Sequence, residues 1–153
     1  MRVAINGFGR IGRSVLRILS DRDDIEVVAI NDIADNKGLV YLFKYDTVMG
    51  TFRGTLALED NIWKVNHHSI KMTAIREVAE LPWKSLGVDI VVEATGRFRK
   101  REQIADHLAA GAKKVILTVP SQDEIDATVV LGVNDKVLKP EHEIVSNASC
   151  TTN

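Results

Sequence analysis

The sequence predicts an α/β fold in which a mostly parallel sheet is covered by helices on both faces. One observation is a set of short, continuous apolar runs with the length of buried parallel strands, at residues 2–6, 26–30, 88–92 and 115–119. The second is that amphipathic, helix-like stretches alternate with these runs. The third is the chain length of 153 residues, with 45% hydrophobic and 27% charged residues, which suits one domain with a sizeable core.

The first strand, turn and helix are predicted at the N-terminus. Residues 2–6 form a short apolar run, and the glycine-rich segment 7–12 follows at once. A helix to about Ser20 is indicated by apolar residues at helical spacing, namely Ile11, Val15, Ile18 and Leu19. Residues 26–30 form the next strand and end at Asn31-Asp32, which completes a βαβ unit.

The middle of the chain has a different pattern. Residues 39–43 predict a short helix. Three short, partly alternating runs follow and are separated by polar turns, at residues 55–58, 62–65 and 69–72. They indicate either antiparallel strands or one extra strand with a hairpin, and we expect them as an insertion in the α/β alternation.

The βα alternation returns after residue 87. Residues 88–92 form a buried-strand run, and residues 115–119 form another that Pro120 stops. Between them a helix over residues 100–110 is predicted, with Ile104, Ala105, Leu108 and Ala109 on one face. Two more strands are expected, at residues 128–131 and 143–145.

Bulk composition narrows the class of partner. A net charge of −1 gives no electrostatic footprint for nucleic acid or an anionic membrane. One cysteine excludes an internal disulfide and fits a reducing compartment. The N-terminal residues lack the apolar run of a signal peptide, and no long apolar segment occurs. We therefore expect a cytoplasmic protein without a membrane segment, and we expect the cations near Arg97 to be a solvated helix start.

Metal binding is not expected. His67 and His68 are adjacent on a predicted strand, so they should point to opposite faces. His107 falls within a helix and His142 in a polar loop, and no pair has the spacing of metal ligands.

The glycine turn carries the clearest functional signal. Gly7, Gly9 and Gly12 follow a strand and open a helix, as in dinucleotide-binding turns, where they allow a tight turn, close phosphate approach and helix packing. Asp32 ends the next strand 20 residues after Gly12, the position of a carboxylate that accepts the ribose hydroxyls. Such a carboxylate favours NAD over NADP, and Arg10 could lie beside the pyrophosphate. The alternative is a helix-packing turn with an ordinary loop acid.

Two further strand ends fit the rule that ligands bind beyond the carboxyl ends of parallel strands. Thr95 and Gly96 close one strand and suit close contact with the cofactor, and Thr118 closes another. Each is also compatible with plain turn chemistry. Glu93 is expected to be a hydrogen-bonded structural group rather than an acid catalyst.

Cys150 has two interpretations that its position alone leaves open. A cysteine in the first turn of a helix meets the positive end of the dipole and gains thiolate character, which suits attack on a carbonyl. A lone cysteine can equally be a small buried hydrophobe.

Motifs along the whole chain resemble the N-terminal half of glyceraldehyde-3-phosphate dehydrogenases. They comprise residues 5–13, Asn31-Asp32, Lys44-Tyr45-Asp46, residues 93–98, His107-Leu108 with residues 110–115, Gly132-Val133-Asn134, and residues 149–153. The resemblance implies a Rossmann-like NAD-binding domain over residues 1–153, which includes the first residues of a catalytic domain at 149–153. One departure is Met49, where the family usually has histidine before the glycine.

The resemblance also implies residue roles. Cys150 would be the nucleophile that forms a hemithioacetal and then a thioester, which inorganic phosphate cleaves to an acyl phosphate. Ser149 and Thr151 would contact the aldehyde phosphate or phosphate. The NAD site would comprise Gly7, Gly9, Arg10, Ile11, Gly12, Asp32, Arg76, Thr95, Gly96 and Thr118. The family's base histidine falls beyond residue 153, so this chain alone is expected to be inactive, and the full protein is expected to be a glycolytic homotetramer.

Two alternatives accompany this interpretation. Erythrose-4-phosphate dehydrogenases share these motifs and act on a substrate one carbon longer. A non-catalytic nucleotide-binding or interaction module with an inert cysteine is the other.

Overall fold

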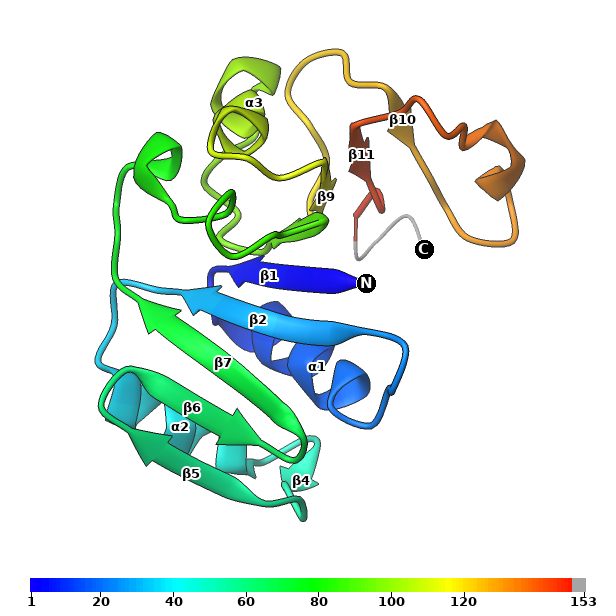
Figure 1. Ribbon diagram of the computed structural model, residues 1–153. Helices are drawn as coiled ribbons and strands as arrows, with labels where there is room; N and C mark the ends of the chain where they lie inside the picture. Colours follow the sequence, from blue (N-terminus) through cyan, green and yellow to red (C-terminus); the bar gives the residue numbers. More distant parts are fainter. Residues whose placement is uncertain (150–153) are drawn as a thin grey trace.

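The computed structural model, which describes residues 1–149, contains a nine-stranded sheet and a separate two-stranded sheet, β3-β4. In the large sheet the strand order is β10-β11-β9-β8-β1-β2-β7-β6-β5 (Figure 1). The elements, with η for a 3-10 helix, are β1 Arg2–Asn6, α1 Arg10–Leu19, β2 Glu26–Asn31, α2 Asn36–Lys44, β3 Tyr45–Asp46, β4 Gly50–Thr51, β5 Leu56–Glu59, β6 Ile62–Val65, β7 His68–Thr73, η1 Val78–Glu80, β8 Ile90–Glu93, α3 Arg101–Ala109, β9 Lys114–Leu117, β10 Ala127–Thr128, η2 Asp135–Val137 and β11 Ile144–Ser146.

The chain builds the sheet outward from β1 in two directions. It first adds β2 and β7 on one side of β1, and it then crosses back to place β8 and β9 on the other side. All pairings from β10 to β7 are parallel. The predicted Rossmann-like class is confirmed, and the β1/β8 border is the point where the strand order reverses.

The insertion predicted in the middle of the chain is one added strand with a hairpin. β7 pairs parallel to β2, whereas β6 pairs antiparallel to both β7 and β5. The hairpin therefore extends the main sheet at its edge instead of forming a separate layer.

Helices cover both faces of the sheet, as predicted. Alternate residues of β1 point to opposite faces, so Val3 and Ile5 join one buried cluster and Ala4 joins the other. α1 and α2 pack over the first cluster, and Figure 1 shows them behind β2, β7 and β6. The second cluster lies under α3 and η1 and contains the fully buried Trp83.

The buried face of α1 differs from the predicted one. Ile11 and Ile18 are 47% and 66% exposed, whereas Gly12 and Leu16 are buried. The apolar spacing was correct for a helix, but the close approach of Gly12 to the turn before it sets the rotation of α1 on the sheet.

Two predictions in the second half were also wrong in detail. α3 buries Ile104 and His107, whereas Ala109, which was assigned to the buried face, is exposed. The strand expected at residues 128–131 is limited to β10, and Leu131 is 85% exposed. His107 can lie in the core because both of its ring nitrogens have hydrogen-bond partners, Trp83 and Glu93.

The two adjacent histidines do not point to opposite faces. His67 lies in the turn before β7, and its ring centroid is 4.1 Å from that of His68. Strand alternation therefore does not apply to this pair. His68 is buried, and burial lowers the pKa of its imidazole.

The Asp126 side chain connects α3 with the residues that begin β11. Its carboxylate accepts hydrogen bonds from the backbone N–H groups of Glu143 and Ile144 and pairs with Arg101 at 2.8 Å. Burial raises the pKa of Asp126, but the N–H groups of Ile144 and Glu143 and the Arg101 guanidinium outweigh it and lower the pKa to about 2. This carboxylate links α3 to the start of β11.

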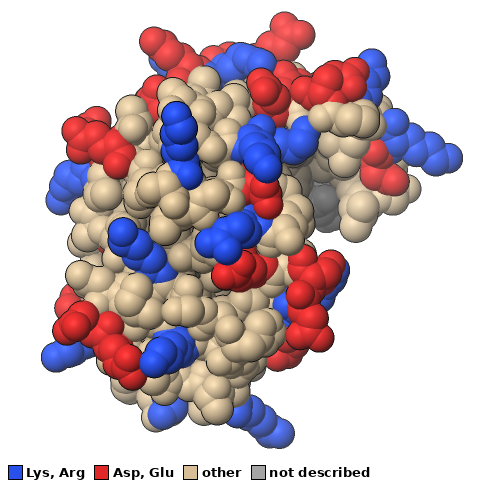
Figure 2. All heavy atoms as spheres, viewed as in Figure 1, with Lys and Arg blue, Asp and Glu red and all other residues tan. Residues whose placement is uncertain are grey.

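Charged side chains of both signs are interspersed on the face shown in Figure 2. This mixture is consistent with the net charge of −1. Within residues 1–149, no helix has the length and apolar character needed to cross a bilayer.

Candidate dinucleotide site

Three neighbouring strands end side by side on polar residues. Asn6 of β1 lies in register with Asn31 of β2 and with Glu93 of β8. All three side chains are buried at the carboxyl edge of the sheet. This edge adjoins the point where the strand order reverses, which is where ligands bind in open α/β sheets.

The glycine turn after β1 needs glycine at two positions. Gly7 has φ +90°, and a Cβ there would lie 2.6 Å from the backbone nitrogen of Thr95. At Gly12, a Cβ would lie 2.2 Å from the carbonyl oxygen of Gly7, so this glycine permits the helix to pack on the turn. These are the turn and packing roles that the sequence predicted.

Gly9 has a different role, because a Cβ at this position would meet no atom of residues 1–149 within 4 Å. Gly9 is exposed and is the N-cap of α1, with no side-chain cap and no acidic residue in the first turn. The free N–H groups and the positive dipole end of α1 therefore face open space. This arrangement fits a diphosphate.

Asp32 shapes the turn as well as facing the cavity. One carboxylate oxygen accepts from the backbone N–H of Phe8 at 2.7 Å, and the other accepts from Ala34 at 2.9 Å. The side chain remains partly exposed. Each oxygen keeps acceptor capacity, so Asp32 can bind hydroxyl groups while it holds the turn.

A cavity of about 250 Å³ lies where these elements meet. Its lining consists of Asn6, Gly7, Gly9, Asn31, Asp32, Ile33, Ile75, Arg76, Ala94, Thr95, Arg97 and Phe98. Five of the predicted cofactor residues are therefore brought together, namely Gly7, Gly9, Asp32, Arg76 and Thr95. Arg97, which was expected to be an ordinary solvated cation, is part of the lining.

The other five predicted cofactor residues lie near the cavity without lining it. Arg10 and Ile11 are exposed in the first turn of α1, and Gly12 is buried beneath the turn. Gly96 follows Thr95 with φ +70°. Thr118 directly follows β9, and its hydroxyl donates to the Glu93 carbonyl at 3.2 Å.

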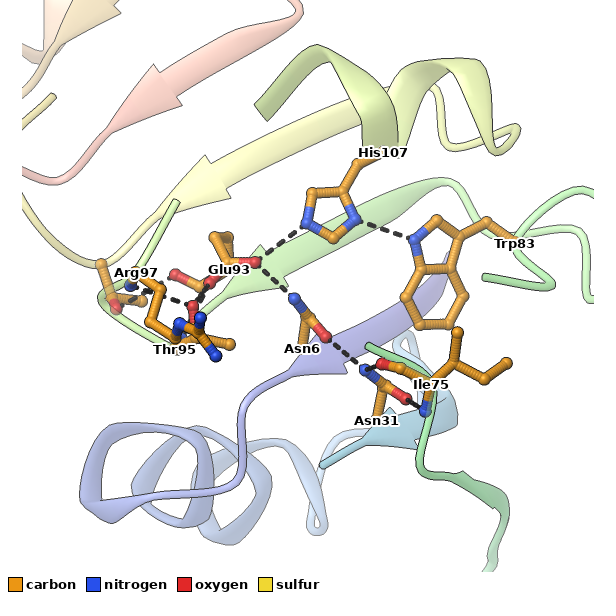
Figure 3. A network of polar contacts seen from close by, with 9 residues as sticks. Asn6, Asn31, Ile75, Trp83, Glu93, Thr95, Arg97 and His107 are labelled. Carbon is orange, nitrogen blue, oxygen red and sulfur yellow. Dashed lines mark hydrogen bonds and ion pairs between the residues drawn. The ribbon is translucent and has the colours of Figure 1, made fainter. Parts of the chain in front are cut away.

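A buried polar network underlies the cavity (Figure 3). Glu93 accepts from the Asn6 side chain at 2.6 Å and from His107 at 2.9 Å, and its other oxygen accepts from the backbone N–H and the hydroxyl of Thr95. Asn31 donates to the Asn6 side-chain oxygen at 2.8 Å. Glu93 is therefore hydrogen-bonded, as expected.

Sequence reasoning missed Asn6, Asn31 and His107 as functional candidates. The signal available for the first two was a polar residue at the end of each of two buried strands. His107 belongs to one of the family motifs, but the motif gave it no role, and its partners Glu93 and Trp83 are 14 and 24 residues away.

The predicted substrate site is only partly within the described residues. Ser149 follows β11 and is partly buried. Cys150 and Thr151 lie outside the described residues. Within residues 1–149 no group of three or more His, Cys, Asp or Glu side chains could hold a metal ion.

A glycine turn opening a helix, an acid at the end of β2 and a cavity where the strand order reverses define a dinucleotide-binding α/β domain. Comparison with known proteins specifies the family. Residues 1–101 match the model of the glyceraldehyde 3-phosphate dehydrogenase NAD-binding domain. The chain belongs to the glyceraldehyde-3-phosphate dehydrogenase family, and the predicted NAD cofactor is confirmed by this match.

Curated proteins that are similar over almost the whole chain are named glyceraldehyde-3-phosphate dehydrogenases. The chain is 56% identical to glyceraldehyde-3-phosphate dehydrogenase of Thermotoga maritima over 99% of its length, and 54% identical to that of Pseudomonas aeruginosa over 100%. It is 50% identical to glyceraldehyde-3-phosphate dehydrogenase 1 of Bacillus cereus over 99%. The chain spans 46% of the length of each relative.

Proposed function

We propose that this chain is the cofactor-binding part of an NAD-dependent, phosphorylating glyceraldehyde-3-phosphate dehydrogenase of glycolysis. The observation that carries the proposal is the cavity that joins the open face of Gly9 to Asp32 at the carboxyl edge of the sheet. The names of the relatives support the substrate. We further propose that residues 1–153 form the NAD-binding domain and that 149–153 begin a catalytic domain.

The cofactor roles follow from the chemistry of the lining. The α1 N-terminus, with Gly9 as the point of close approach, holds the diphosphate, and Arg10 and Ile11 extend that surface. Asp32 accepts from the adenosine ribose hydroxyls, and its charge disfavours a 2′-phosphate. Arg76, Thr95 and Gly96 bound the adenosine end, with Thr118 behind them. NAD, when bound, supplies the two-electron acceptor that aldehyde oxidation requires.

Cys150 supplies the nucleophile in this proposal. Its thiolate adds to the aldehyde carbon and forms a hemithioacetal, and oxidation of that carbon leaves a thioester. Inorganic phosphate attacks the thioester carbonyl, which gives an acyl phosphate and returns the thiolate. Ser149 and Thr151 hold the substrate or the incoming phosphate. The full protein acts as a homotetramer.

The chain by itself does not turn over, because none of its four histidines is available as a base at the cavity. His67 and His68 contact carbonyls of residues 19–22 at the amino end of β2, and His142 precedes β11 at the same edge of the sheet. His107 has both ring nitrogens in hydrogen bonds inside the core.

The test combines binding and turnover on the 153-residue chain. Calorimetric titration should give NAD binding that is tighter than NADP binding, and no NADH should form with glyceraldehyde 3-phosphate and phosphate. Absence of NAD binding would refute the cofactor site. Steady NADH formation would refute the claim that this chain has no catalytic base. If NADH does form, the same assay with erythrose 4-phosphate compares the two candidate substrates.

Alkylation tests the nucleophile separately. Cys150 is the only cysteine, so the mass gain with iodoacetamide reports on this residue alone. Reaction faster than a free thiol near neutral pH supports an activated thiolate. Reaction at the free-thiol rate supports an inert cysteine.

A further inference from the structure

Glu93 is a fully buried carboxyl group whose hydrogen-bond partners among residues 1–149 are the side chain of Asn6, the imidazole of His107, and Thr95. Its side chain is 0% exposed, and it accepts four hydrogen bonds, from Asn6, His107 and twice from Thr95. A buried carboxylate is costly unless its lone pairs are satisfied. Each donor therefore matters to where this carboxylate lies.

The neighbour on the far side fixes the tautomer of His107. The Trp83 indole N–H can only donate, and it lies 2.9 Å from Nδ1 of His107. Nδ1 must accept, so the proton of the neutral ring is on Nε2. Nε2–H then donates to Oε2 of Glu93 at 2.9 Å. Hydrogen bonds are therefore donated in one direction, from Trp83 to His107 and from His107 to Glu93.

Glu93 also forms hydrogen bonds with residues that line the cavity. Oε2 also accepts from Asn6, which precedes the glycine turn, and Oε1 accepts from the backbone N–H and hydroxyl of Thr95. Asn6 and Thr95 both line the cavity, and the space next to Gly7 is bounded by the Thr95 backbone. One carboxylate thus sets the spacing between the glycine turn and the loop that faces it (Figure 3).

We propose that His107 is a positioning residue of the dinucleotide site, which acts through Glu93 on Asn6 and Thr95 without contacting the cofactor. The inference rests on the proposed function, since it takes this cavity to be the NAD site. Its action depends on the Nε2–H donor and not on the bulk of the ring.

Two amide substitutions separate the two ring nitrogens. His107→Gln places an N–H donor near the Nε2 position and keeps the bond to Glu93. His107→Asn places its amide near the Nδ1 position, so it retains a partner for Trp83 and loses the bond to Glu93. We expect the NAD dissociation constant to rise about tenfold in His107→Asn and to stay within about threefold of wild type in His107→Gln.

His68 provides a matched control. It is also buried, its Nδ1 accepts from the Val27 N–H, and its Nε2 faces the Leu19 carbonyl, so it has the same pattern of contacts. It lies at the amino end of β2, opposite the cavity. His68→Asn and His68→Gln should lower stability to urea and leave the NAD dissociation constant within about twofold of wild type.

A spectroscopic measurement on the unsubstituted chain covers the case in which a variant fails to fold. In protein labelled with ¹⁵N-histidine, saturating NAD should shift the Nε2–H signal of His107 and leave that of His68 in place. The shift is expected because Glu93 accepts from His107 and Thr95 together.

The outcomes are distinguishable. If the wild-type chain does not bind NAD, the proposed function fails and this inference fails with it. If wild type binds NAD but His107→Asn and His107→Gln bind equally, or the His107 signal does not move, only the positioning role is overturned. An affinity loss in the His68 variants as large as in His107→Asn would also overturn it, since affinity would then follow stability alone.

Discussion

Substitution of Gly9 by alanine separates cofactor binding from folding. Gly9 has φ −71° and ψ −156°, an extended conformation that alanine can adopt, and in the described part of the chain the added Cβ has no neighbour within 4 Å. The methyl group would project into the open space before α1 where the diphosphate is proposed to lie. Gly9→Ala should therefore fold normally and bind NAD poorly.

The magnitudes follow from the geometry at Gly9. Replacing glycine reduces the entropy of the unfolded chain, while alanine is a poorer N-cap than glycine, so the free energy of unfolding should change by less than about 1 kcal/mol. Keeping a phosphate away from the helix N-terminus removes at least one charge-assisted hydrogen bond, worth about 1.5–3 kcal/mol. NAD affinity should fall about 10- to 100-fold.

Urea denaturation and calorimetric titration measure the two effects, and Gly12→Ala is the contrast. A Cβ at Gly12 would lie 2.2 Å from the Gly7 carbonyl oxygen and 3.3 Å from the Ile5 side chain, so that variant should lose roughly 3 kcal/mol of stability. Wild-type NAD affinity in Gly9→Ala would show that the phosphates do not approach this turn, and the reasoning would be wrong.

Three other substitutions test separate parts of the structure. Asp32→Asn should weaken NAD binding about tenfold and reduce the preference for NAD over NADP, because the ribose acceptor loses its charge; an unchanged preference in paired titrations would contradict this role. Asp126→Asn should lower the free energy of unfolding by about 2 kcal/mol at neutral pH, since, despite burial, hydrogen bonds lower the pKa of Asp126 from 3.8 to about 2. That stability is present above pH 3.8 and disappears as the pH falls towards 2, so urea curves of the two proteins should converge there; a constant difference would refute the assignment. Gly38→Ala should raise stability by about 0.5–1 kcal/mol, because Gly38 lies in α2 and the nearest atom to an added Cβ is 3.7 Å away; a fall in the urea midpoint would contradict this.

Local sequence pattern was sufficient for the main elements. Buried parallel strands have continuous apolar runs, so β1, β2, β8 and β9 were predictable. The rotation of α1 was not, because it depends on how closely Gly12 packs against the turn, a tertiary contact. The early end of β10 also depends on tertiary structure, since residues 129–131 have strand-like composition but leave the sheet after Thr128.

The site divides in the same way. Gly7, Gly9 and Asp32 belong to one βαβ unit with fixed spacing, so the sequence could place them together. Thr95 was expected from the rule for strand ends. Asn6, Asn31 and His107 were missed because their roles depend on which strands are neighbours and on a bond from α3 to Glu93 of β8, and neither is encoded in local spacing.

The register of three strands explains why the site is organised in the chain on its own. β2, β1 and β8 end together on Asn31, Asn6 and Glu93, which would leave polar groups buried at the sheet edge. Burial without partners would cost several kcal/mol, on the order of 1–3 kcal/mol for each group. Hydrogen bonds to each other, to Thr95 and to His107 remove that cost, and the same bonds hold the cavity walls. The hydrogen bonds that folding requires are therefore the same ones that shape the cavity. A ligand that binds there pays little entropy to order the backbone, and this favours affinity.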